Sequence, residues 1–385
     1  MDNGHIPFNK PFIIGKELYY VAQSVLSGHT AGDGPYSRRC KEFLQERFSV
    51  AQVLLTTSCT SALEMAALLC DIAPGDEVVL PSYTFVSTAN AFLLRGARPR
   101  FVDIRPDTLN LDETRLEEAL SDRTVAIVAV HYAGIGCEMD VIMPLARQRG
   151  ITVIEDAAQG VNARYRGAYL GTIGDMGAYS FHETKNFICG EGGAFVTDDP
   201  GLIQRAEIVR EKGTNRPQFF RGEVDKYTWV DIGSSYLPSD LLAAFLYAQL
   251  EHMDEITAKR QAIYDGYYQG LEPLAAQGLL TLPTIPAHCE PNYHMFYMLV
   301  ADLETRSRLL AYLKRRDIHA VFHYVPLHTS PVGQKMGYEA GMLPVTEALS
   351  ERLIRLPFFY ELTDSEVTRV VETIHAFFAN GGGSD

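Results

Sequence analysis

Residues 52–104, QVLLTTSCTSALEMAALLCDIAPGDEVVLPSYTFVSTANAFLLRGARPRFVDI, decide the fold class. Short apolar runs alternate here with longer stretches in which apolar residues recur every three or four positions. The first pattern is typical of buried strands and the second of amphipathic helices. The alternation continues to residue 158 and predicts a mostly parallel sheet with helices on both faces. The expected strands are 52–57, 76–81, 98–104, 124–132 and 151–158, and the expected helices are 61–73, 85–96, 114–121 and 141–150.

The pattern changes near residue 250. A long helical stretch, 237–274, is followed by shorter runs that indicate a smaller α+β unit, at 294–302, 306–318 and 320–328. We therefore expect a large α/β domain with an N-terminal segment over 1–250, and a smaller C-terminal domain over 251–385. The tail NGGGSD, 380–385, is flexible by composition.

Composition excludes several classes of function. No apolar run reaches the roughly 18 residues of a membrane span, and the N-terminus lacks the basic and apolar regions of a secretory signal. The formal charge of −14 opposes binding to nucleic acid or to anionic membranes. Six cysteines without CxxC spacing favour reduced thiols in the cytoplasm over a disulfide framework or a zinc site. No glycine-rich nucleotide motif is present, and no metal is expected.

Lys185 is the most informative charged residue. Most of the nine lysines should be solvated surface charges, but Lys185 follows the aromatic strand GAYSFH and precedes the glycine-rich run GEGG. Glycines allow the backbone to pass close to a bulky group. The surroundings therefore favour an amine held inside a site.

Asp156 closes the apolar strand ITVIED. In parallel sheets ligands bind beyond the carboxyl ends of the strands, so this position is a candidate for function. A carboxylate buried there is costly unless a cation meets it. Two other interpretations stay open from the residues alone, namely the N-cap of a following helix and a magnesium ligand.

Two further features follow predicted strands. In TTSCTSALE, Ser61 and Glu64 have the spacing of a capping box, and the N-terminus of that helix would form an anion site together with the hydroxyls of Ser58 and Thr60. The alternative is a capped helix without a ligand. Phe85, after the next strand, could cover a flat ring or belong to the core.

Taken together, these residues fit pyridoxal 5′-phosphate. This cofactor requires a lysine for its aldehyde, a carboxylate for its ring nitrogen, an anion site for its phosphate and a flat wall. Lys185 would bind the cofactor and then move protons, and Asp156 would keep the ring nitrogen protonated. Pyridoxamine 5′-phosphate would be the amino form of the cofactor.

The stretches EDAAQG and GAYSFHETKNFICGEGGAF resemble the DegT/DnrJ/EryC1/StrS family of sugar aminotransferases, with PSYTFVSTANAF and HYVPLH as further landmarks. The resemblance covers nearly the whole chain. It implies a fold-type I, aspartate aminotransferase-like architecture and a homodimer with each active site at the subunit interface. The site residues that it implies are Lys185 as the Schiff-base lysine, Asp156 at the ring nitrogen, Gln159 at the ring hydroxyl, Phe85 stacked on the ring, and Cys59 (through its amide), Thr60 and Ser180 at the phosphate.

The chain departs from the family pattern in GSSYL. Ser235 stands where relatives have an asparagine that reaches the partner subunit's phosphate, and Leu237 stands where they have an arginine. Ser235 is kept as a candidate cofactor contact.

The resemblance also implies the substrates: the amino group of L-glutamate passes to the 4-keto carbon of dTDP-4-dehydro-6-deoxy-D-glucose, giving the galacto-configured 4-amino sugar. The basic segment 210–229 could hold the pyrophosphate or could be a solvated loop. Alternatives are a family member that makes the gluco epimer or aminates carbon 3, and a regulator that binds the cofactor without turnover. The candidate substrate contacts are Arg216, Arg221, Lys212, Tyr324 and His328.

Overall fold

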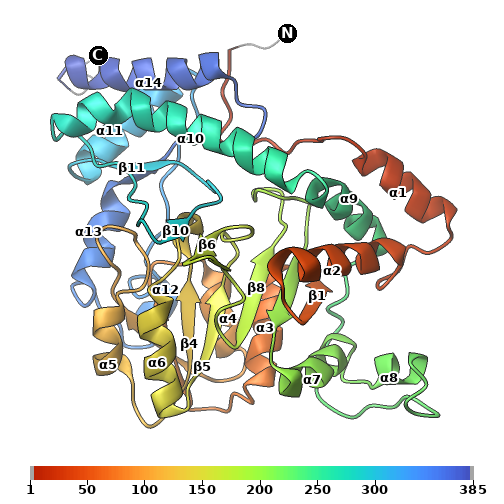
Figure 1. Cartoon of the computed structure of the whole chain (residues 1–385). Helices are drawn as coiled ribbons and strands as arrows, with labels where there is room; N and C mark the ends of the chain where they lie inside the picture. The colour runs from red at the N-terminus through yellow and green to blue at the C-terminus, as the bar shows by residue number, and fades with distance from the viewer. Residues whose placement is uncertain (1–3, 382–385) are drawn as a thin grey trace.

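Residues 4–381 are described by the computed structural model, so the tail expected to be flexible lies partly outside the described residues, at 382–385. Within this range the largest sheet has seven strands, in the order β1-β9-β8-β5-β4-β2-β3 (Figure 1). In that spatial order the strands are β1 (Gln52–Thr56), β9 (Gly193–Thr197), β8 (Met176–Ser180), β5 (Thr152–Asp156), β4 (Thr124–Val130), β2 (Glu77–Pro81) and β3 (Arg98–Val102).

The sheet is mostly parallel, as predicted. β8, β5, β4, β2 and β3 pair in parallel, whereas β9 is antiparallel to both of its neighbours, β8 and β1. Ser180 at the end of β8 lies opposite Gly193 at the start of β9. The connection 181–192, which carries Lys185, therefore leaves and re-enters the sheet at the carboxyl edge of its parallel strands.

Alternate residues of the strands belong to two different cores. Leu55 and Ile127 pack in the core that includes residues of α2, α6 and α9, whereas Leu54 and Val128 pack in the core that includes residues of α3, α4 and α7. Because both faces are covered, the inner strands are buried along their length and mostly apolar rather than alternating, whereas the edge strand β3 alternates, with Arg98 and Arg100 exposed. This burial on both faces explains the continuous apolar runs of the sequence.

The helices alternate with these strands along the first half of the chain and dominate the second half. Within the described range, a helix both long and apolar enough to span a bilayer is absent. The helices are α1 (Glu17–Leu26), α2 (Pro35–Phe48), α3 (Cys59–Leu69), α4 (Val86–Leu93), α5 (Leu116–Ala119), α6 (Met139–Arg149), α7 (Pro200–Arg210), α8 (Arg216–Phe220), α9 (Asp240–Leu250), α10 (Met253–Ala276), α11 (Leu303–Lys314), α12 (Pro331–Lys335), α13 (Pro344–Arg352) and α14 (Asp364–Ala379).

The C-terminal part has its own core. α10, α11 and α14 lie together at the top of Figure 1 and pack around the antiparallel pair β11 (Tyr297–Leu299) and β12 (Leu353–Arg355). The N-terminal segment joins this core through Ile6, which forms a parallel bridge with Ile318. The helical stretch expected over 237–274 is broken between α9 and α10. A small separate sheet contains β6 (Arg164–Tyr165), β7 (Ala168–Tyr169) and β10 (Cys289–Glu290).

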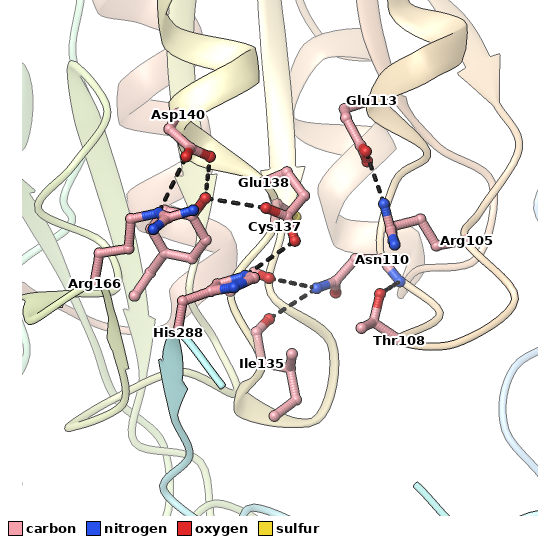
Figure 2. A network of polar contacts seen from close by, with 12 residues as sticks. Arg105, Thr108, Asn110, Glu113, Ile135, Cys137, Glu138, Asp140, Arg166 and His288 are labelled. Carbon is pink, nitrogen blue, oxygen red and sulfur yellow. Dashed lines mark hydrogen bonds and ion pairs between the residues drawn. The ribbon is translucent and has the colours of Figure 1, made fainter. Parts of the chain in front are cut away.

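A polar network fixes the loop that follows β4 (Figure 2). The side-chain amide of Asn110 donates to the carbonyl oxygens of Ile135 and Gly136, both at 3.0 Å, and its oxygen accepts from the amide of Tyr132 at 2.8 Å. Glu138, farther along the same loop, lies 3.1 Å from His288, which directly precedes β10 (Figure 2). The network therefore holds in place the loop that presents Tyr132 and Ala133.

The start of α3 corrects one prediction. The cap is Ser58, whose hydroxyl accepts from the amide of Ser61 at 3.1 Å, so the helix begins at Cys59. Ser61 lies inside the first turn, and the proposed capping box of Ser61 and Glu64 is wrong. The consequence is that the amides of Cys59 and Thr60 belong to the N-terminal turn and are available to a ligand.

Candidate active site

A cavity of about 570 Å³ opens at the carboxyl ends of the parallel strands. It is lined by the turn from β1 to α3, the turn from β2 to α4, the end of β5, the β8–β9 connection and segments of the C-terminal part. Its volume lies within the usual range for small-molecule sites. The structure thus brings eight of the predicted residues into one cavity: Cys59, Thr60, Phe85, Asp156, Gln159, Ser180, Lys185 and Tyr324.

Lys185 is half-buried, and its backbone amide closes a turn by donating to the carbonyl oxygen of His182 at 2.9 Å. Burial lowers the pKa of its amine, Cys59 and Asp156 partly oppose that shift, and the positive charge of Arg355 adds to it. A lowered pKa increases the fraction of neutral amine, the form that attacks a carbonyl carbon. The environment therefore suits a nucleophilic lysine.

Asp156 ends β5 and is 6% exposed. The hydroxyl of Thr88 donates to one carboxylate oxygen at 2.7 Å, and the amide of Ala158 donates to the other at 3.1 Å. The described residues directly after Asp156, 157–163, form turns and no helix, so Asp156 is not a helix N-cap. The hydrogen bonds orient a carboxylate that lines the cavity, as required of a partner for a protonated ring nitrogen.

The N-terminus of α3 could bind an anion. Within the described residues, no hydrogen bond occupies the backbone amides of Cys59 and Thr60. The hydroxyl of Thr60 donates to Ser87 at 2.8 Å, which adds a second hydroxyl at this end. Gly193 packs directly against the turn, and a Cβ atom there would lie 2.4 Å from the carbonyl carbon of Ser58. The backbone thus forms a cradle that could hold an anion such as a phosphate.

Gln159 links the loop after β4 to the C-terminal part of the chain. Its side-chain oxygen accepts from the amide of Ala133 at 2.7 Å, and its nitrogen donates to the hydroxyl of Tyr324 at 3.1 Å. Phe85, at the N-cap of α4, is 56% exposed, and its ring centroid lies 6.3 Å from that of Tyr324. A half-exposed phenylalanine on a cavity wall suits ring stacking better than core packing.

Five predicted residues lie outside this cavity, and four of them, Ser235, Lys212, Arg216 and Arg221, belong to the segment 211–235. Ser235 is exposed, and its backbone bridges to that of Glu211. Lys212 and Arg216 pair with Glu211 at 3.0 Å and 2.9 Å, and Arg221 pairs with Glu207 at 2.8 Å. The two arginines line a second cavity of about 470 Å³. One chain alone does not bring these cations to Lys185.

His328 requires a correction. It is buried, one ring nitrogen lies 2.7 Å from the hydroxyl of Ser82, and the other lies 3.0 Å from Glu347. Both ring nitrogens are therefore engaged, and His328 does not line the cavity. Its role is to fix the segment that carries Tyr324, and the prediction of a substrate contact is withdrawn.

Several cavity residues were not singled out from the sequence: Phe8, Thr88, His294 and Arg355. His294 is buried beside Asn186 at 2.8 Å, and burial holds its pKa well below the ordinary value, so its ring is neutral. Arg355 interrupts the apolar run LIRLPFF. This is the same signal, a charge within a buried strand, that identified Asp156.

The arrangement fits pyridoxal phosphate on its own geometry. A half-buried amine, an oriented carboxylate, a free helix N-terminus and an aromatic wall share one cavity, with an amide, Gln159, beside them. Fold and site together define a fold-type I, pyridoxal-phosphate-dependent aminotransferase.

Comparisons with known proteins agree with this class. The model of the DegT/DnrJ/EryC1/StrS aminotransferase family matches residues 12–375, and the chain belongs to that family. An uncharacterized protein of Methanocaldococcus jannaschii is 33% identical over 95% of this chain and 97% of its own length.

Two solved structures show the same fold. The aminotransferase TlmJ from Streptoalloteichus hindustanus is 32% identical, with a TM-score of 0.89 over 98% of this chain and 100% of its own. A candidate sugar aminotransferase of Streptococcus pneumoniae, Spr1654, in its pyridoxal phosphate form is 26% identical, with a TM-score of 0.90 over 98% of this chain and 99% of its own. Pyridoxal phosphate is the cofactor of this family, so the predicted architecture, enzyme class and cofactor are confirmed.

Proposed function

We propose that this sugar aminotransferase moves the amino group of L-glutamate to the 4-keto carbon of dTDP-4-dehydro-6-deoxy-D-glucose. The product would be dTDP-4-amino-4,6-dideoxy-D-galactose, which makes the chain a dTDP-4-amino-4,6-dideoxygalactose transaminase. Such a sugar would serve surface polysaccharides of the enterobacterial common antigen type. The observation that carries the aminotransferase chemistry is Lys185, with its lowered pKa, in one cavity with Asp156.

Each of the cavity residues would have a separate role. When bound, the cofactor supplies an aldehyde and an electron-accepting ring, which take up an amino group from one substrate and release it to the other. Lys185 would bind the cofactor through its Nζ and then move a proton with that atom. Asp156 would keep the ring nitrogen protonated, Gln159 would contact the ring hydroxyl, and Phe85 would cover the ring.

The phosphate would rest on the N-terminus of α3. Cys59 would contribute its backbone amide, and Thr60 and Ser180 would contribute hydroxyls. Helix N-termini favour anions through free amides and the helix dipole. Ser235 would add a contact from the partner subunit.

The proposed homodimer accounts for the cations that lie far from Lys185. Large apolar side chains are exposed on α1 and on the segment 219–232, among them Leu26 at 78%, Phe220 at 70% and Trp229 at 75%. Exposed apolar patches of this kind mark interaction surfaces. In a dimer, Arg216 and Arg221 would serve the partner's cavity and hold the pyrophosphate of the sugar nucleotide. With six free cysteines, the protein suits the reducing cytoplasm.

The test is product identification. Protein loaded with pyridoxal phosphate is incubated with L-glutamate and dTDP-4-dehydro-6-deoxy-D-glucose, and NMR should show an axial amine at carbon 4. An equatorial amine, or amination at carbon 3, would move the chain to another member of the family. No conversion of the cofactor to its amine form with glutamate would favour a regulator without turnover.

Variants test the arginine assignment separately. Arg216→Ala and Arg221→Ala should each raise KM for the sugar nucleotide about 10-fold or more, because each removes a charge-assisted contact. The half-reaction with glutamate should stay nearly unchanged. Arg149→Ala is the matched control, since Arg149 pairs with Glu117 on the surface and lines neither cavity. An unchanged KM in both variants would remove this segment from the sugar site.

A further inference from the structure

Asn186, the residue that follows Lys185, is held in place by its side chain. It is 2% exposed, and within the described residues neither its backbone amide nor its carbonyl group forms a hydrogen bond. Its side-chain nitrogen donates to the carbonyl oxygen of Asn292 at 2.7 Å, and its side-chain oxygen lies 2.8 Å from Nδ1 of His294. The polar anchors of the chain beside Lys185 therefore come from the segment 291–296, which precedes β11.

These contacts define the protonation of His294. The side-chain nitrogen of Asn186 is used by Asn292, so its oxygen faces His294. A carbonyl oxygen can only accept, so Nδ1 of His294 carries a hydrogen and donates it. Burial, together with the charges of Lys185 and Arg355, holds the pKa of the ring well below its ordinary value, so the ring is neutral. Nε2 therefore keeps its lone pair, and no described residue forms a hydrogen bond with it, although the ring lines the cavity.

The backbone that carries His294 is fixed from α10. Arg260 is 3% exposed, and its Nε donates to the carbonyl oxygen of Tyr293 at 2.9 Å. A terminal nitrogen of the same guanidinium donates to the carbonyl oxygen of His294 at 2.6 Å. The histidine ring is therefore a fixed point from which Asn186 can be held.

Asn292 connects the same segment to another wall of the cavity. Its side-chain nitrogen donates to the carbonyl oxygens of Gln159 and Val161, both at 2.8 Å, in the turn that follows β5. The backbone at Lys185 is thereby placed relative to Gln159, through the side chains of Asn186 and Asn292. Placement of this kind matters for a nucleophile, because a displacement of about 1 Å can slow a reaction ~10²-fold.

We propose that His294 is a positioning residue for Lys185, acting through the hydrogen bond from its Nδ1 to Asn186. The bond fixes the backbone from which the lysine side chain extends into the cavity, and the cavity-facing Nε2 takes no part. The proposal rests on the proposed role of Lys185 as the residue that binds the cofactor.

The test separates attachment of the cofactor from its binding. The full-length apoprotein is mixed with pyridoxal 5′-phosphate, and covalent attachment, in which Nζ of Lys185 joins the aldehyde carbon and one water leaves, is followed by absorbance. His294→Leu should slow attachment about 10- to 100-fold, because the amine is displaced. Its affinity for pyridoxamine 5′-phosphate should stay near that of wild type, because this form has no aldehyde and does not bond to the lysine.

Two conservative variants distinguish the ring nitrogens. The side-chain nitrogen of an asparagine can take the place of Nδ1, so His294→Asn should recover most of the attachment rate. A glutamine places its amide where Nε2 lies, so His294→Gln should stay slow.

Asn186→Ala tests the other end of the same hydrogen bond. It should slow attachment as much as His294→Leu, and the double variant should be no slower than either, since both changes remove one bond. His375→Leu is the matched control. Its ring nitrogen lies 2.8 Å from the carbonyl oxygen of Gly270, also in the C-terminal part, but His375 lines neither cavity, so attachment should proceed at the wild-type rate.

Three results would overturn the assignment. The first is an unchanged attachment rate in His294→Leu. The second is an equal loss of pyridoxamine 5′-phosphate affinity, which would make the role of His294 purely structural. The third is recovery in His294→Gln but not in His294→Asn, which would assign the effect to Nε2. Should His294→Leu fail to fold, any order other than His294→Asn faster than His294→Gln overturns the proposal.

Lys185→Met separates this assignment from the proposed function. Covalent attachment of the cofactor in that variant would refute the role of Lys185. Loss of attachment there, together with a normal rate in His294→Leu, would refute only the role of His294.

Discussion

Gly193→Ala tests the phosphate cradle directly. The new Cβ would lie 2.4 Å from the carbonyl carbon of Ser58 and 2.5 Å from the amide nitrogen of Cys59. Both atoms belong to the backbone and cannot rotate away. To reach ordinary contact, the turn before α3 must move by about 1 Å, a displacement large enough to misplace a binding group.

The magnitude follows from the hydrogen bonds at stake. Two amides that donate to a phosphate each contribute about 1.5–3 kcal/mol, and a shift of this size weakens both without abolishing them. We expect pyridoxal phosphate affinity to fall about 10- to 100-fold, and the free energy of unfolding of the apoprotein to fall by about 1–3 kcal/mol through overpacking. Absorbance titration of the apoprotein with the cofactor, and urea unfolding, measure the two effects.

Gly15→Ala is the control, because its Cβ would meet only the His252 ring nitrogen at 3.5 Å, an ordinary contact. It should leave both quantities within error. If Gly193→Ala lowers stability but cofactor affinity stays within twofold of wild type, the N-terminus of α3 does not hold the phosphate, and the cradle is only a packing contact.

Three other predictions concern the cofactor residues. Borohydride reduction of the holoenzyme should attach the cofactor to Lys185, and a label on another residue would contradict the assignment. Lys185→Ala should lower the turnover rate ~10²–10⁴-fold. Asp156→Asn should retain the cofactor but slow proton transfer, and a near wild-type rate in this variant would show that Asp156 has only a structural role. Thr88→Val should lower the free energy of unfolding of the apoprotein by ~1.5–3 kcal/mol, because it removes a hydrogen bond to the Asp156 carboxylate. The lowered pKa of Lys185 means that the unfolded chain binds more protons between that pKa and 10.5, so apoprotein stability should rise with pH across this window. Urea midpoints should show Lys185→Met more stable than wild type below the window and the difference shrinking within it; a difference independent of pH would refute the shift.

Local patterns predicted six of the seven strands of the large sheet and drew attention to Asp156 and Lys185, but they predicted neither β9 nor its antiparallel pairing with β1 and β8. A strand buried on both faces must be apolar, so a charge at its end, as at Asp156, stands out without knowledge of the partner strands. Lys185 stood out through its glycine neighbours. In contrast, Thr88 acts only through a contact formed by folding, and a threonine in a helix carries no local signal of it.

Boundaries were less predictable for a physical reason. The start of α3 depends on which of two serines turns its hydroxyl toward the backbone, and Ser58 and Ser61 are equally suited by type. The break between α9 and α10 is invisible because both helices share one apolar period. The cations of 210–229 look concentrated in the sequence, but acidic neighbours such as Glu211 and Glu207 pair with them in space.

The pairing of Ile6 with Ile318 has a consequence for synthesis of the protein. The backbone amide of Ile6 donates to the carbonyl oxygen of Asp317, and the backbone amide of Phe358 donates to the carbonyl oxygen of Phe8. Phe8 lines the cavity. During synthesis, Ile6 and Phe8 therefore wait for partners more than 300 positions later, a delay of about 15–60 s at ordinary translation rates. Until those partners emerge, the wall beside Arg355 is incomplete. The cavity around Lys185 is therefore completed only late in the synthesis and folding of the chain.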